Sequence, residues 1–200
     1  MTELAVTKAK TNIRAMTMTA LLAAMSSVLM FFDFPITFFP AFVRMDFSDL
    51  PALIGAFALG SVAGMVIELV KNFIHLTQTQ TGGVGELANF LIGSALVLPA
   101  GLIYKYNKTR RGALVGMLSG TIVMAIFAAL TNYFFLIPFF SIFMPLDAII
   151  EMCAVITPVI NSLGKMILFS VVPFNLFKAA VLCFVTSISY KRLSRLIQGQ

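Results

Sequence analysis

The sequence contains few of the side chains on which metal sites and acid–base catalysis depend. It has one histidine, two cysteines and no tryptophan. Hydrolases and metalloenzymes carry such residues at set spacings, and no His-Glu-x-x-His, Gly-x-Ser-x-Gly or phosphate-loop pattern occurs. Cys153 and Cys183 stand in apolar surroundings without metal-ligand spacing, so we interpret both as packing residues. There is therefore little reason to expect an enzyme or a resident metal.

Charged residues are also scarce, at 11% of the chain, whereas 60% is hydrophobic. A soluble domain is nearer half apolar and a quarter charged. Long apolar runs between short polar clusters are typical of membrane helices, because the strands of a barrel alternate with period two. We therefore predict an all-α integral membrane protein with a single domain over residues 1–200. The net charge of +6 does not indicate nucleic-acid binding, because the basic residues lie beside the apolar runs.

The first apolar run, Ala15 to Phe32, follows three basic residues, as the core of a signal peptide would. It is too long for such a core, and it lacks a small-x-small cleavage site, so we predict a retained first helix. Ala20 and Ala24 form a small-xxx-small pair on this helix. Such a pair allows another helix to approach closely, either from a partner protein or within this chain.

The apolar run from Pro51 to Leu76 fits either one long span or two short spans that turn between Gly60 and Gly64. Basic residues favour the cytoplasmic side. Ten of the 14 occur in three clusters: Lys8, Lys10 and Arg14; Lys105, Lys108, Arg110 and Arg111; and Lys191, Arg192 and Arg195. Only the folded version brings all three clusters to that side. We therefore predict six transmembrane helices with both termini cytoplasmic, at roughly 13–32, 49–60, 62–76, 86–104, 112–135 and 173–192. The second is short for a hydrocarbon core of ~30 Å.

Two segments are expected outside the membrane or folded back onto it. Residues 33–50 carry charges and prolines between many phenylalanines, and we predict a loop that covers the membrane domain, because its aromatic rings would otherwise meet water. Residues 136–172 are interrupted by prolines and by Asn161. Their apolar pieces, 146–156 and 163–172, are predicted to be short helices that form a second cap.

Polar side chains from four distant stretches are predicted at the outer ends of the helices. They are Asp46 between Met45 and Phe47, Glu86 with Asn89, Asn132 with Tyr133, and Asn175 with Lys178. Amides offer a paired donor and acceptor to a heterocycle, and aromatic rings offer faces for stacking. This convergence predicts an outward-facing pocket for a small molecule, under the outer loops.

The pairing of these groups can also be predicted. Asn175 and Lys178 are three residues apart, on one face of a helix that Pro173 can start. A lysine inside a membrane segment needs a partner, and we predict Glu86. The alternative role of Glu86 is to stabilise a helix N-terminus, and that of Asn132 is to end a helix beside an interfacial aromatic belt.

Two further groups have simpler interpretations. Glu68 and Lys71 are three residues apart within a span, and we predict a local ion pair. His75 stands near a predicted helix end without carboxylate or cysteine spacing around it, and we interpret it as an interfacial residue rather than a ligand or a base.

The chain resembles a known family in a series of motifs that extends over most of its length. They are Met45-Asp46-Phe47-Ser48-Asp49-Leu50-Pro51, Ala58-Leu59-Gly60-Ser61-Val62-Ala63-Gly64, Gly85-Glu86-Leu87-Ala88-Asn89-Phe90, Thr131-Asn132-Tyr133 and Pro173-Phe174-Asn175-Leu176-Phe177-Lys178. Their order and spacing resemble the riboflavin-specific substrate-binding (S) components of energy-coupling factor (ECF) transporters. The resemblance implies a multi-pass protein of the plasma membrane that binds a vitamin, has no catalytic step, and works with a transmembrane coupling protein and two ATPase subunits.

The resemblance also implies roles for particular residues. Glu86, Asn132, Asn175 and Lys178 would bond the flavin ring, the loop from Met45 to Phe47 would cover it, and Ala20 and Ala24 would contact the coupling protein. The chemistry agrees, because the pyrimidine edge of isoalloxazine has two carbonyls and one N–H, which suit two amides and an ammonium. Riboflavin is uncharged, and a phosphorylated flavin would call for further cations.

Three alternatives stay open from the sequence. The pocket could take another vitamin or heterocycle. A metal-dependent membrane enzyme could use Glu68, Asp46 and Asp49, although no histidine supports them. A purely structural partner protein is the third, and a lysine inside a membrane span with no ligand argues against it.

Overall fold

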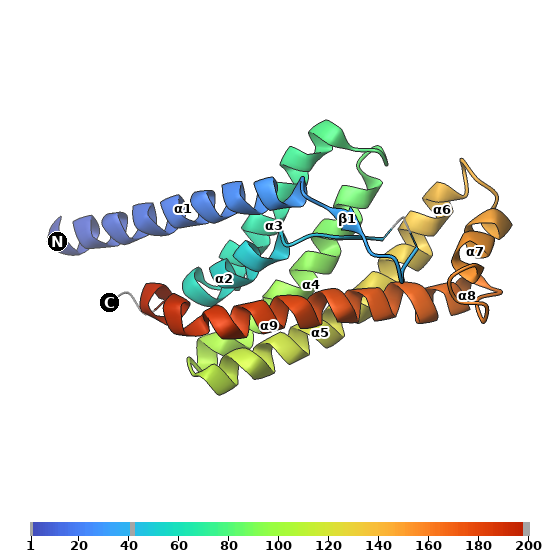
Figure 1. The fold of residues 1–200 in the computed structure, drawn as a ribbon. Helices are drawn as coiled ribbons and strands as arrows, with labels where there is room; N and C mark the ends of the chain where they lie inside the picture. Colours follow the sequence, from blue (N-terminus) through green and yellow to red (C-terminus); the bar gives the residue numbers. More distant parts are fainter. Residues whose placement is uncertain (1, 41–42, 198–200) are drawn as a thin grey trace.

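The computed structural model describes residues 2–40 and 43–197, with side chains described for 13–40 and 43–188. It is mostly helical. Its longer helices are α1 (Thr2–Met30), α2 (Asp49–Leu59), α3 (Ser61–His75), α4 (Val84–Tyr106), α5 (Arg110–Thr131) and α9 (Val172–Ile197). Figure 1 shows a bundle in which the start of α1 and the end of α9 lie at one end. The small strands and the short helices α6 to α8 lie at the other end, which we call the loop end.

The predicted break between the second and third helices is confirmed. Gly60 alone separates α2 from α3, with a φ of 104° that L side chains rarely adopt. The two helices then pack closely in antiparallel directions, because a Cβ on Gly64 would lie 2.8 Å from the Cβ of Ala56. A side chain on Gly55 would likewise overlap Ile67. Small residues on both helices therefore allow the hairpin to close.

Two helices run further than the sequence predicted, and both do so across a proline. α5 continues through a π turn (Asn132–Leu136) into α6 (Ile137–Phe140), and α8 (Leu163–Met166) continues through a second π turn (Ile167–Val171) into α9. The predicted end near residue 135 and the predicted start at 173 are therefore wrong, and Asn132 does not end a helix.

The π turns explain why these helices continue past their prolines. Proline has no N–H and crowds the carbonyl four residues earlier, which normally ends a helix. Each π turn ends two residues before a proline, Pro138 or Pro173. The wider turn moves the hydrogen bond back by one residue, so that the N–H of Ile137 bonds Asn132 and that of Val172 bonds Ile167.

The loop after α1 folds back over the bundle, as predicted. Strand β1 (Phe34–Pro35) pairs antiparallel with β2 (Arg44–Met45), with Phe34 opposite Met45. Val43 and Met45 pack against Phe174 of α9, and Phe39 meets the same ring edge-on. The segment between β2 and α2 is thereby held over the start of α9.

One of the two short helices predicted within residues 136–172 is present as a separate helix. Helix α7 (Leu146–Ala154) replaces the predicted 146–156, whereas residues 163–172 belong to the long helix that includes α9. A small core of its own joins this region, made of Ile137, Ile149, Cys153, Ile160 and Met166. Cys153 is a buried packing residue, as predicted, and burial raises the pKa of its thiol.

Four helical stretches of the described chain are long and apolar enough to cross a membrane, namely 13–30, 84–106, 110–140 and 163–188. The chain is thus a helical membrane protein, and α2 and α3 are shorter. The basic cluster from Lys105 to Arg111 lies at the α4–α5 turn, at the end of the bundle where α1 starts and α9 finishes (Figure 1). The side chains of Lys8, Lys10, Lys191, Arg192 and Arg195 lie outside the described residues.

Candidate ligand-binding site

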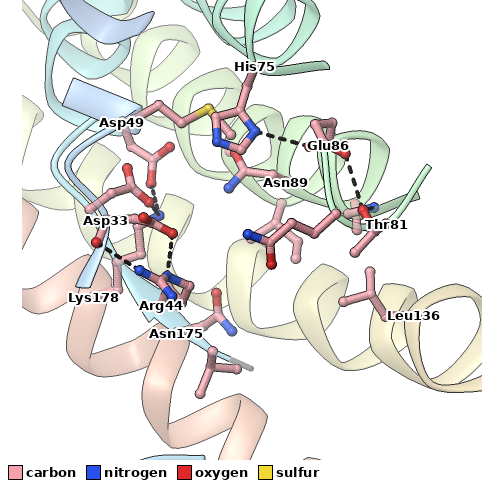
Figure 2. Close-up of a pocket in the computed structure, with 18 of the residues that line it drawn as sticks. Asp33, Arg44, Asp49, His75, Thr81, Glu86, Asn89, Leu136, Asn175 and Lys178 are labelled. Atoms are coloured by element: carbon pink, nitrogen blue, oxygen red, sulfur yellow. Dashed lines mark hydrogen bonds and ion pairs between the residues drawn. The ribbon is translucent and has the colours of Figure 1, made fainter. Parts of the chain in front are cut away.

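A cavity of about 490 Å³ opens at the loop end of the bundle. It lies between helices α3, α4, α6 and α9 and the described residues 33–40 and 43–48, which contain β1 and β2 and which we call the strand segment. Its size lies within the usual range of small-molecule sites. The apolar part of its lining includes Ile92, Leu136, Phe140 and Phe174. The polar part includes Asp46 and Asn132. It also includes six residues that Figure 2 labels: Asp49, His75, Glu86, Asn89, Asn175 and Lys178. Arg44 and Asp33 also line the cavity and form an ion pair of 2.5 Å.

Six of the nine predicted ligand-binding residues line this cavity: Asp46, Glu86, Asn89, Asn132, Asn175 and Lys178. The other three are not part of the lining. Met45 and Phe47 pack inside the strand segment with Val43 and Phe174. Tyr133 is 47% exposed and packs against Phe134.

The two amides predicted from the sequence are held in the same way on different helices. The side-chain N–H of Asn132 donates to the carbonyl of Ala128 at 2.8 Å, and that of Asn175 donates to the carbonyl of Val171 at 2.9 Å. Neither amide oxygen accepts a hydrogen bond from the described residues. Each amide therefore has a fixed orientation and a free acceptor in the cavity wall.

Lys178 does not pair with Glu86, so that prediction is wrong. The ammonium of Lys178 lies 2.9 Å from Asp46 Oδ2 and 2.8 Å from Asp49 Oδ2. Lys178 is buried, as are both carboxylates. The strand segment brings Asp46, and the start of α2 brings Asp49, to the first turns of α9. The long separation of these residues in the sequence concealed this arrangement.

Glu86 lies across the cavity from Lys178 (Figure 2) and has a different set of partners. Its Oε1 is 3.0 Å from Nδ1 of His75, and its Oε2 accepts from the hydroxyls of Thr79 at 2.9 Å and Thr81 at 3.2 Å. The ring of Phe31 stacks on His75 with centroids 5.5 Å apart. His75 is thus a cavity residue and not merely an interfacial one. Residues 76–83, between α3 and α4, bring these groups together. Nothing in the sequence of this turn indicated that His75 would contact Glu86.

The predicted ion pair of Glu68 and Lys71 is confirmed, at 2.7 Å. Lys71 has further partners that the sequence did not indicate, because it also binds the carboxylate of Asp49 and donates to Ser48 Oγ at 2.8 Å. Since Asp49 also pairs with Lys178, these residues join the cavity to the interior of the bundle.

The carboxylates proposed for a metal-dependent enzyme are thus occupied by lysines. Asp46, Asp49 and Glu68 each form an ion pair with Lys71 or Lys178. Among the described residues, no three His, Cys, Asp or Glu side chains are grouped so that they could hold a metal ion.

Ala20 and Ala24 lie on the exposed face of α1, whereas Ala23 and Ser27 on the opposite face are buried. The possibility that this pair packs inside the chain is therefore wrong. The face that they share is free to meet another molecule.

A bundle of apolar helices around a cavity of polar and aromatic side chains defines a membrane protein that binds a small molecule. The comparison with protein families is more specific. The chain belongs to the family described as the substrate-specific component of ECF transporters, whose model matches residues 14–190. It is therefore a component of a transport system and not an enzyme.

Individual relatives cover nearly the whole chain. It is 34% identical to the riboflavin transporter RibU of Staphylococcus aureus (strain TCH60) over 179 residues, which are 90% of this chain and 89% of that protein. It is 28% identical to the riboflavin transporter FmnP of Bacillus subtilis (strain 168) over 192 residues, 94% of this chain and 96% of the relative.

A solved structure is also similar, with a TM-score of 0.72 and 33% sequence identity. It covers 92% of this chain and 97% of the other, and was described as "Structure and mechanism of the S component of a bacterial ECF transporter". At this identity the likeness extends beyond the fold to the family.

Proposed function

We propose that this chain is the riboflavin-binding subunit of an ECF importer. It binds the vitamin at the outer face of the plasma membrane and delivers it to a coupling protein and two ATPase subunits. Its family, and relatives named as riboflavin transporters, support this proposal. The whole chain, residues 1–200, acts as one membrane domain.

The observation that carries the proposal is the chemistry of the cavity wall. Asn132, Asn175 and Lys178 line one cavity with Ile92, Leu136 and Phe140. Two amides and an ammonium suit the carbonyls and the N–H on the pyrimidine edge of isoalloxazine, and apolar side chains suit its dimethylbenzene end. Glu86 and Asn89 contact the ligand from α4, and Asp46 does so from the strand segment. Met45 and Phe47 hold that segment in place as a cover. Tyr133 does not line the cavity, and we assign it no contact with the ligand.

We propose six membrane crossings with both termini in the cytoplasm. The α2–α3 hairpin supplies the second and third crossings. The basic α4–α5 turn lies at the same end as the start of α1 and the end of α9 (Figure 1), as the positive-inside rule requires. The cavity then faces outward.

The exposed pair Ala20 and Ala24 is proposed to receive the coupling protein. Small residues four apart let the backbone of a partner helix come close, and lipid tails compete poorly for such a groove.

The decisive experiment is the visible absorption spectrum of the protein purified in detergent from cells grown in rich medium. We expect the paired near-ultraviolet and blue bands of oxidised flavin, and quenching of riboflavin fluorescence when the vitamin is added back to stripped protein. A colourless protein that does not quench riboflavin would contradict the assignment. Recovery of a different vitamin from the purified protein would identify a related S component instead.

A further inference from the structure

Five charged side chains form a continuous buried group, which we call the buried charge cluster: Asp46, Asp49, Glu68, Lys71 and Lys178. All five are buried, and Glu68 and Lys71 are 0% exposed. Three carboxylates against two ammoniums would leave one net negative charge. An uncompensated charge inside a membrane protein is costly, so the cluster requires one more positive charge.

The contacts of the three carboxyl groups identify where that charge belongs. Asp49 binds Lys71 through Oδ1 and lies 2.8 Å from Lys178 through Oδ2. Asp46 lies 2.9 Å from Lys178 and accepts from the N–H and the hydroxyl of Ser48. Each of these two carboxylates has several positive or donor partners. Both are therefore well stabilised in the ionised form.

Glu68 has much less support. Its only ion-pair contact is Oε2 to Lys71 at 2.7 Å, and neither of its oxygens makes a hydrogen bond with the described residues. Lys71 is shared with Asp49 and Ser48. Glu68 is therefore the weakest place in the cluster for a negative charge.

Besides Lys71, no cation forms an ion pair with Glu68 among the described residues. On α3, the side-chain N–H of Asn72 donates to the backbone carbonyl of Glu68 at 2.8 Å, and the buried Oδ1 of Asn72 has no hydrogen-bond partner among the described residues. On α4, Gly93 lies directly against the Glu68 carboxyl, since a Cβ there would overlap it. A proton on Glu68 would remove the charge from a carboxyl group whose two oxygens have no hydrogen-bond partner among the described residues.

We propose that Glu68 binds a proton and is a neutral carboxylic acid in the folded protein, which leaves the buried charge cluster without net charge. The charged groups that face Glu68 are Lys71 from its own helix and Asp49 from α2. Lys178 from α9 and Asp46 from the strand segment act through Asp49. The proton is independent of any ligand, so the inference goes beyond the proposed function.

The proton matters for the cavity because Gly93, Asp46, Asp49 and Lys178 all line it. Ionised Glu68 would compete with Asp49 for the ammonium of Lys71. Asp49 would then attract the ammonium of Lys178 more strongly. The neutral form of Glu68 keeps the ammonium of Lys178 shared between Asp46 and Asp49 at the cavity wall.

The proposal is tested without ligand, on the purified full-length protein. Its infrared spectrum at neutral pH is expected to contain the C=O stretch of a protonated carboxylic acid. This band is expected to vanish in Glu68→Gln and to remain in Glu151→Gln, a control at an exposed position. Absence of the band in the wild type, or its persistence in Glu68→Gln, would overturn the proposal.

Stability supplies a second readout. The unfolded chain loses this proton above about pH 4.3, so a proton retained on folding makes stability fall as the pH rises. We expect the thermal midpoint of the wild type to fall between about pH 6 and about pH 9 relative to Glu68→Gln. Glu68→Gln is expected to be at least as stable as the wild type at neutral pH, because it folds without taking up a proton, whereas Asp49→Asn is expected to be strongly destabilised. Equal damage by the two substitutions, or stabilisation by Na⁺ in place of a proton, would contradict the inference.

Discussion

The ammonium of Lys178 lies 2.9 Å from the carboxylate of Asp46, which stands 132 positions earlier in the chain. This ion pair attaches the segment that covers the cavity to the helix that carries Asn175. Because both groups also line the cavity, the same contact stabilises the fold and defines one wall of the site. The consequences of removing it can therefore be measured in both stability and binding.

Replacement of Lys178 by Met is expected to lower the free energy of unfolding by about 3–5 kcal/mol, because Asp46 loses its lysine and Asp49 keeps only Lys71. Asp46→Asn in the same molecule removes the unpaired charge and should restore part of that loss. Thermal unfolding in detergent measures both variants. A double variant no more stable than Lys178→Met would show that the charge of Asp46 is not the cause.

Asn175→Leu is expected to weaken riboflavin binding roughly 10–100-fold, since a ligand group would lose its amide partner in a buried site. Fluorescence quenching of riboflavin measures the affinity. Asn107→Leu is the matched control, because Asn107 is an exposed amide at the far end of α4. Equal affinities for wild type and Asn175→Leu would remove this residue from the site.

His75→Ala should weaken riboflavin binding by up to about tenfold, because Glu86 loses the contact that fixes its Oε1. His75→Gln retains a side-chain donor and should lie closer to the wild type. Both affinities are obtained from the same quenching titration. If Ala and Gln at this position bound equally well, the imidazole would not be orienting Glu86.

Gly60→Ala is expected to destabilise the protein by about 1–3 kcal/mol through backbone strain, since no atom stands within 4 Å of the added Cβ. Gly164→Ala is the control. It also meets nothing within 4 Å, but Gly164 lies in α8 without positive φ, so alanine should be neutral or stabilising. Thermal midpoints distinguish the two, and similar effects at both positions would argue against strain at Gly60.

Ala24→Trp should leave riboflavin binding intact and abolish uptake of labelled riboflavin by cells, because the indole would occupy the exposed face of α1. Leu118→Trp on the exposed side of α5 serves as the control and should preserve both activities. Normal uptake by Ala24→Trp would place the contact with the coupling protein elsewhere.

Local signals predicted much of the fold. The break at Gly60 followed from the glycines at 60 and 64 and from the positions of three basic clusters along the chain. The prolines misled the prediction of helix ends, because Pro138 and Pro173 indicate a helix end unless a π turn precedes them. Whether a helix widens to admit a proline depends on its packing, which the neighbouring residues in sequence do not reveal.

The candidate site, like the fold, could be predicted from the sequence only in part. The positions of Asn132, Asn175 and Lys178 could be predicted from their places on helices. The partner of Lys178 could not, because it depends on how the strand segment folds over α9. Met45 and Phe47 do not line the cavity because neighbouring side chains of an extended chain point to opposite sides. Asp46 therefore faces the cavity, whereas Met45 and Phe47 pack away from it. Tyr133 misses the cavity because adjacent helical residues point in different directions.

The hairpin at Gly60 bears on how the protein enters the membrane during synthesis. The 11 residues of α2 rise only about 16 Å, roughly half of a hydrocarbon core. Neither α2 nor the 15 residues of α3 presents the length that an insertion machinery retains as a single segment. We expect the two helices to leave the translocon together, already paired through Gly55 and Gly64. Their glycine contacts would then act at biogenesis, before the cavity exists.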